Sequence, residues 1–74
     1  MKLRKDIKRG KVTSTLEKIK HLRESKKITQ TQMAELIGIH KDTYVNKEIG
    51  KTQFTVLELM KLMLILDCKP EDIF

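Results

Sequence analysis

The chain has 74 residues, of which 35% are charged and 39% are hydrophobic, and its formal net charge is +6. This length has room for one small domain, and so charged a chain cannot enclose a deep active-site cleft. Residues 1–12 carry six Lys/Arg against one Asp, so they hold +5 of the net charge of +6. The excess suggests a polyanionic partner.

Several classes of site and location are not expected. Cys68 is the only cysteine, which excludes an internal disulfide and fits the cytoplasm. His21 and His40 lack metal-ligand spacing, so neither a metal nor a cofactor is predicted. No nucleophile–base pair or carboxylate pair is visible, so the chain is not expected to be an enzyme. The longest apolar run, Leu62–Leu66, is too short to span a membrane, and the basic N-terminus lacks the apolar stretch of a signal peptide.

The first segment, residues 1–12, is predicted to be a basic arm ahead of a folded domain over residues 13–74. Two interpretations of the arm remain open. It is either a solvated tail or a segment that follows the phosphate backbone or enters the minor groove of DNA.

Three capping boxes predict where helices begin, because a Ser or Thr hydroxyl accepts a free helix N–H and a Glu or Gln three residues later reaches back. The pairs are Ser14 with Glu17, Thr29 with Gln32, and Thr55 with Glu58. After the first box, Leu16, Ile19 and Leu22 follow at helical spacing, and this helix is expected to end near Lys26 or Lys27.

Two short helices, over residues 30–37 and 41–47, are joined by a tight turn at residues 38–40. Ala34 lets the second helix cross closely over the first, and Gly38 accepts the positive φ of the turn. Met33, Ala34 and Ile37 are predicted to share the buried face. This arrangement is a helix-turn-helix, which places its second helix in the major groove of DNA.

The C-terminal part predicts a fourth helix over residues 56–66 and a terminal turn that begins at Pro70. The core face of the fourth helix is predicted to be Val56, Leu59, Met60, Met63 and Leu66. Ile73 and Phe74 are expected to close the core. A second apolar face, formed by Leu57, Leu64 and Ile65, is a candidate dimer interface. The alternative is that Phe54, the C-terminus or the arm covers this face.

From about Ile19 to Phe74 the sequence resembles the Cro/repressor-type, XRE-like helix-turn-helix family, with its lambda-repressor-like domain. The residues that carry the resemblance are LRESKKITQTQMAELIGIHKDTYVNKEIGK and LELMKLMLILDCKPEDIF. The resemblance implies a compact all-α domain of four to five helices. It also implies binding to a double-stranded DNA operator, usually as a homodimer on a palindromic site.

The resemblance also implies roles for individual residues. The base-reading positions are His40, Lys41, Asp42, Val45 and Asn46. The phosphate contacts are Gln30, Lys51 and Thr52. For Asp42 the alternative is a carboxylate that only complements the helix dipole, and for His40 it is a simple N-cap.

Three further residues are expected to build the scaffold of this motif. Arg23 and Glu48 correspond to an ion pair that joins the first helix to the end of the third, and Arg23 is predicted to hold Glu48 bidentately. Tyr44 is expected to bury its ring. Lys47 stands where relatives have an apolar residue, and its ammonium is expected to reach water.

The function predicted from these features is transcriptional regulation, by a repressor of phage, prophage or bacterial origin that needs no small-molecule ligand. The chain has no room for a separate sensor domain. The alternative is a protein-interaction module, such as an antitoxin or anti-repressor, that uses the apolar face of the fourth helix.

Overall fold

A computed structural model describes the backbone of residues 11–74 and the side chains of residues 15–74. It contains the helices α2 (Lys11–Ser25), α3 (Gln30–Ile37), α4 (Lys41–Glu48), α5 (Val56–Leu66) and α6 (Pro70–Ile73). No strand occurs between residues 11 and 74. The predicted all-α architecture is therefore confirmed, whereas residues 1–10 of the predicted arm lie outside the described residues.

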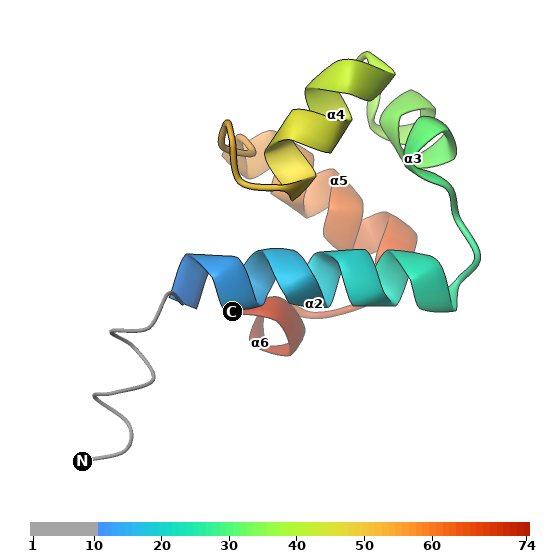
Figure 1. The fold of residues 1–74 in the computed structure, drawn as a ribbon. Coiled ribbons are helices and arrows are strands. Elements are labelled where there is room, and N and C mark those ends of the chain that lie inside the picture. The colour runs from blue at the N-terminus through green and yellow to red at the C-terminus, as the bar shows by residue number, and fades with distance from the viewer. Residues whose placement is uncertain (1–10) are drawn as a thin grey trace.

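The helices surround one small core, with α3 and α4 on one side of α2 and α6 on the other (Figure 1). Every described helix contributes at least one fully buried apolar side chain. These are Ile19, Met33, Ala34, Ile37, Tyr44, Leu62, Leu66 and Ile73. Removing this apolar surface from water is the main force that holds such short helices together, because helices of eight residues are unstable alone.

Two of the three predicted capping boxes are present, and one is wrong. Thr29 accepts from the backbone N–H of Gln32 at the start of α3, and Thr55 accepts from that of Glu58 at the start of α5. By contrast, α2 already begins at Lys11, which makes Ser14 an interior residue of that helix. An N-cap residue has a non-helical backbone, so Ser14 is not the N-cap of α2.

The end of α2 falls where it was predicted, one residue before Lys26. The chain then reverses at Lys27, whose φ is 59°, and the N–H of Ile28 bonds the carbonyl of Arg23 at 3.1 Å. A left-handed residue here closes the last turn of the helix, a position that glycine usually fills. This conformation carries a steric cost for lysine, and it sets the direction in which the chain enters α3.

The predicted buried face of α5 is wrong at two positions. Val56 and Met60 are 75% and 53% exposed, whereas Leu62, omitted from the prediction, is completely buried. The predicted Leu66 is buried, and Leu59, Met63 and Ile65 are half-buried against the core. Because α5 is apolar almost all round, its sequence pattern does not determine which face meets the core.

The C-terminus is also only partly as predicted. Pro70 opens α6, and Ile73 closes the core at 1% exposure. Phe74 does not close the core, because 54% of it is exposed. One short turn can direct only one of two adjacent side chains inward.

Candidate nucleic-acid interface

The corner between α3 and α4 is built by a left-handed glycine. Gly38 has φ 83°, and its N–H bonds the carbonyl of Ala34 at 2.9 Å, as does the N–H of Ile39. Nothing lies within 4 Å of where a Cβ on Gly38 would be, so its backbone conformation, and not crowding, requires glycine. Ala34 is buried beneath the crossing, and Ile39 packs against the core.

His40 is the N-cap of α4. Its Nδ1 accepts from the backbone N–H of Asp42 at 3.2 Å, so the ring carries its proton on Nε2 when it caps. The His40 and Asp42 side chains are 76% and 83% exposed, and Nδ1 of His40 lies 4.0 Å from Oδ2 of Asp42. His40 therefore caps α4 while most of its ring stays exposed. The Asp42 carboxylate, in the first turn of α4, complements the helix dipole.

The other predicted base-reading residues lie on the same helix at helical spacing. Lys41 is exposed, and Val45 and Asn46, one turn further on, are half-buried. The side-chain amide of Asn46 makes no hydrogen bond to any part of residues 15–74, although its backbone carbonyl accepts from the N–H groups of Lys51 and Thr52. The exposed side of α4 thus keeps its polar atoms available for a partner.

A buried carboxylate fastens the far end of α4 to α2. Glu48 Oε2 lies 2.9 Å from Arg23 Nε, and Oε1 lies 3.2 Å from Arg23 Nη2, so the guanidinium binds both oxygens. The remaining Nη1 of Arg23 donates to the carbonyl of Ile28 at 2.7 Å. The side chains of Arg23 and Glu48 are only 7% and 2% exposed. Arg23 lies near the end of α2, and Ile28 lies just before α3. The ion pair therefore fixes α4 against both ends of the segment that connects these two helices.

Two more donors complete the surroundings of Glu48. The hydroxyl of Tyr44, one turn earlier on α4, donates to Oε2 at 2.6 Å, and Nε2 of Gln30 donates to Oε1 at 3.0 Å. Burial alone would raise the pKa of Glu48, but the hydrogen bonds from Arg23, Tyr44 and Gln30 hold it below its ordinary value. The sequence indicated the Arg23 contact but neither of the other two, although the spacing of Tyr44 and Glu48 is that of helical neighbours.

Tyr44 is expected to resist ionisation. Burial, followed by its hydrogen bond to Glu48, raises the pKa of its hydroxyl above the ordinary value of about 10. The folded state therefore keeps a proton that the unfolded state loses above about pH 10, and stability falls as the pH rises further. Tyr44 is the only tyrosine in the chain, so an alkaline titration of tyrosinate absorbance reports it alone. Ionisation should coincide with the loss of helical circular dichroism; tyrosinate forming near pH 10 in the helical protein would contradict this expectation.

Lys47 does not reach water, and this prediction is wrong. Its side chain is only 12% exposed, and its ammonium donates to Oε1 of Glu58, which is 13% exposed. Glu58 is also the third residue of α5 and accepts from the backbone N–H of Thr55 at 2.9 Å. The pair therefore links the end of α4 to the start of α5, in a place where relatives use apolar contact. Burial acts to raise the pKa of Glu58, but Lys47 and Thr55 hold it below its ordinary value.

The substitution Glu58→Gln is expected to cost about 1–2 kcal/mol at neutral pH, between the values of surface and buried pairs. Glutamine preserves the capping box but leaves the ammonium of Lys47 without its counter-charge. Because the folded pKa of Glu58 is lowered, its stabilisation is complete above the unfolded pKa of about 4.3 and is lost as the pH falls through the folded value. Urea unfolding at several pH values should show the variant's deficit shrinking in acid.

The control for that measurement is Glu35→Gln, which removes the same charge from an exposed position on α3. It should change the free energy of unfolding by less than about 0.5 kcal/mol at any of these pH values. An equal deficit for Glu35→Gln and Glu58→Gln would show that net charge, and not the contact with Lys47, sets the effect.

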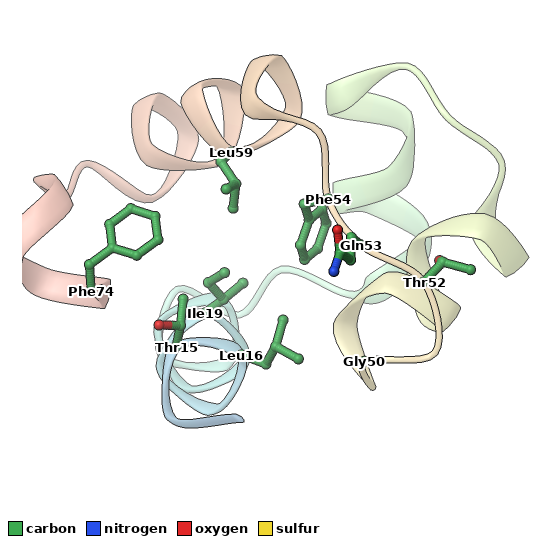
Figure 2. Close-up of a pocket in the computed structure, with 9 residues that line it drawn as sticks. All are labelled: Thr15, Leu16, Ile19, Gly50, Thr52, Gln53, Phe54, Leu59 and Phe74. Carbon is green, nitrogen blue, oxygen red and sulfur yellow. The ribbon is translucent and has the colours of Figure 1, made fainter. Parts of the chain in front are cut away.

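An apolar cavity of about 340 Å³ lies beside the loop that follows α4 (Figure 2). Its lining joins α2, the loop, the start of α5 and the C-terminus: Thr15, Leu16, Ile19, Gly50, Thr52, Gln53, Phe54, Leu59 and Phe74. None of these side chains is ionisable, so the cavity offers no acid, base or metal ligand. Gly50 has φ 89°, and a Cβ there would lie 3.2 Å from Cδ1 of Leu16. Any other residue here would be strained by the positive φ and would also require Leu16 to shift by a few tenths of an ångström, so glycine favours the close approach of the loop to α2.

Two other kinds of feature are absent from the described part of the chain. Within it, no three His, Cys, Asp or Glu side chains gather as they would around a metal ion. None of the described helices combines the length and the apolar character that crossing a bilayer requires.

A comparison with known protein families agrees with this geometry. A family model described as helix-turn-helix matches residues 19–73, from Ile19 in α2 to the end of α6. The chain belongs to this helix-turn-helix family. The resemblance to Cro/repressor-type, XRE-like proteins is thus confirmed, together with the lambda-repressor-like fold. No curated protein and no solved structure matches the chain. Membership of the family makes the chain a DNA-binding domain of the kind found in transcription regulators.

Proposed function

We propose that this protein is a sequence-specific transcription regulator, a repressor of phage, prophage or bacterial type, which reads double-stranded DNA with α4 in the cytoplasm. The observation that carries the proposal is the corner between α3 and α4. It exposes the N-terminal half of α4, whereas Tyr44 and Glu48 fasten the opposite side of the same helix to the core. A rigid helix with a free polar face is what entry into the major groove requires.

The exposed residues of α4 supply chemistry for each kind of base contact. Lys41 donates to guanine O6 and N7, the amide of Asn46 pairs with adenine, and the methyls of Val45 contact the thymine methyl. Asp42 accepts from cytosine N4 or only complements the dipole, and His40 is exposed enough to contact a base or a phosphate. These five positions together define the proposed reading surface.

Phosphate contacts fix the position of the reading surface on the duplex. Lys51 and Thr52 are exposed directly after α4, and Gln30 is the first residue of α3. The basic segment over residues 1–12 adds charge for the same backbone. All of these contacts hold DNA without distinguishing its sequence.

We further propose that the regulator is a homodimer that pairs through α5. The exposed apolar face of this helix contains Val56, Leu57, Met60 and Leu64, of which Leu64 is 82% exposed. The originally predicted Ile65 lies at the edge of this face, half-buried against the core. Lys61 lies beside this face, but its ammonium donates to the carbonyl of Ile37 at 3.3 Å. An apolar face of this kind can pair with the same face of a second copy across a two-fold axis. Two copies would present recognition helices about 34 Å apart to a palindromic operator.

The function is tested by selecting bound duplexes from a random pool and measuring their affinity at several salt concentrations. Enrichment of a palindrome with half-sites one helical turn apart is expected, with affinity that falls steeply as salt increases. Enrichment of one unpaired half-site would refute the dimer alone. No binding to any duplex at low salt would refute the function as a whole.

The second candidate function is a protein-interaction module, such as an antitoxin or anti-repressor. The exposed apolar face of α5 favours it, because apolar patches on small domains commonly mark protein contacts. Ultracentrifugation of Leu64→Lys separates the candidates. Loss of a dimer together with loss of operator affinity supports the regulator, whereas an unchanged monomer that binds no duplex supports the interaction module.

A further inference from the structure

Gln30 is bound to the buried carboxylate of Glu48, although its proposed partner is a DNA phosphate. Its Nε2 lies 3.0 Å from Glu48 Oε1, and the side chain is half-buried. A carboxylate only accepts hydrogen bonds, so the nitrogen of the amide, and not its oxygen, must face inward. The second N–H of the same nitrogen makes no bond to any of residues 15–74 and remains available.

The carboxylate itself is held rigidly. Oε1 receives Gln30 and Nη2 of Arg23, and Oε2 receives Nε of Arg23 and the hydroxyl of Tyr44. Four donors satisfy the acceptor capacity of Glu48, and its side chain is 2% exposed. Its position is therefore determined by α2 and α4 before any ligand arrives.

The charge balance of this cluster also favours an anion at Gln30. An unpaired carboxylate so near the start of α3 would repel a phosphate. Here the guanidinium of Arg23 contacts both carboxylate oxygens, so the pair presents no net charge. The amide of Gln30 can then be oriented by a carboxylate without the repulsion that a free carboxylate would bring.

We propose that Glu48 is a positioning residue for DNA binding, which fixes the side-chain amide of Gln30 so that its second N–H points at a backbone phosphate. This inference rests on the proposed function. A glutamine held in one rotamer binds without the entropy loss of ordering a free side chain. The buried ion pair would thus serve the phosphate contact as well as the fold.

The first test examines the free protein by nuclear magnetic resonance. Side-chain 15N relaxation should give the Nε2 of Gln30 a high order parameter, close to that of the rigid backbone, as expected for a fixed group. The amide of Gln53, which is exposed and bonded to no other part of residues 15–74, provides the mobile control. An order parameter for Gln30 as low as that of Gln53 would overturn the proposal, and this result does not depend on whether any variant folds.

The second test is a double-mutant cycle on duplex affinity. Gln30→Ala should weaken binding about tenfold in the wild-type background, as expected for a hydrogen bond to a charged group. In the Glu48→Gln background the same change should cost less than about threefold, because the amide is no longer oriented. Comparing Gln30 with Ala within each background cancels the added charge that Glu48→Gln leaves on Arg23.

The outcomes separate this proposal from the function on which it rests. Wild-type protein that binds duplex DNA, with equal Gln30→Ala losses in both backgrounds, would leave Glu48 a purely structural residue and overturn this inference alone. Wild-type protein that binds no duplex would overturn both. If circular dichroism shows that Glu48→Gln does not fold, the nuclear magnetic resonance measurement on Gln30 in the wild type decides whether the amide is fixed.

Discussion

Replacing Glu48 by alanine is expected to lower the free energy of unfolding by about 3–5 kcal/mol, the range found when one partner is removed from a buried ion pair. The loss would arise mainly from what remains behind. Arg23, whose side chain is 7% exposed, would keep its charge, with only the carbonyl of Ile28 and the exposed carboxylate of Glu24 as remaining partners. The hydroxyl of Tyr44 would lose its acceptor as well. Urea unfolding followed by circular dichroism at neutral pH measures the change.

The chain supplies a matched control, because Arg23 has a second carboxylate neighbour. Glu24 Oε2 lies 3.8 Å from Nη2 of Arg23, and the side chain of Glu24 is 55% exposed. Solvent screening makes such a pair worth less than about 1 kcal/mol, so Glu24→Ala should change stability little. Similar costs for Glu24→Ala and Glu48→Ala would mean that burial does not distinguish the two contacts, and would contradict the scaffold role of Glu48.

Local signals in the sequence were sufficient for the helix-turn-helix itself. Thr29, Ala34 and Gly38 each act within a few residues of chain: a cap, a close crossing and a left-handed turn. Such features depend on spacing alone, so the α3 and α4 boundaries were predictable. The Ser14 box failed because a capping sequence does not prevent the preceding residues from being helical.

Contacts between distant segments were not predictable in the same way. The Lys47–Glu58 pair joins residues eleven positions apart across a loop, and no local rule brings them together. The orientation of α5 was not predictable for a different reason. An almost wholly apolar helix can present any face to the core, and in the fold, where α5 contacts α3, the buried side is the one that carries Leu62. The expectation that the ammonium of Lys47 reaches water failed because nothing in the local sequence places the carboxylate of Glu58 beside it.

The partner of Gln30 illustrates the limit for the candidate site. The resemblance implied a phosphate contact for this residue and indicated no partner inside the fold. Its inward bond to Glu48 depends on where α4 ends relative to the start of α3, eighteen residues away. Only the three-dimensional arrangement shows that one side chain belongs to both the scaffold and the proposed interface.

The substitution Asn46→Ala is expected to remove discrimination at one base pair, worth about 1–3 kcal/mol between the preferred base and its alternatives. The side-chain amide of Asn46 has no hydrogen-bond partner within residues 15–74, so its loss should hardly affect the fold. The backbone carbonyl that holds Lys51 and Thr52 remains in the variant. Sites selected from a random duplex pool by wild type and variant should differ at a single position in each half-site, with the other positions unchanged.

Gln30→Ala is the contrasting variant for the same experiment, because a phosphate contact carries no sequence information. It should weaken every duplex by a similar factor and leave the selected consensus intact. The two changes remove the same kind of group, an uncharged amide, from the start of α3 and from the exposed face of α4. A uniform loss for Asn46→Ala would therefore remove this residue from the reading surface. A single-position change for Gln30→Ala would instead place its outward N–H on a base edge and not on the backbone.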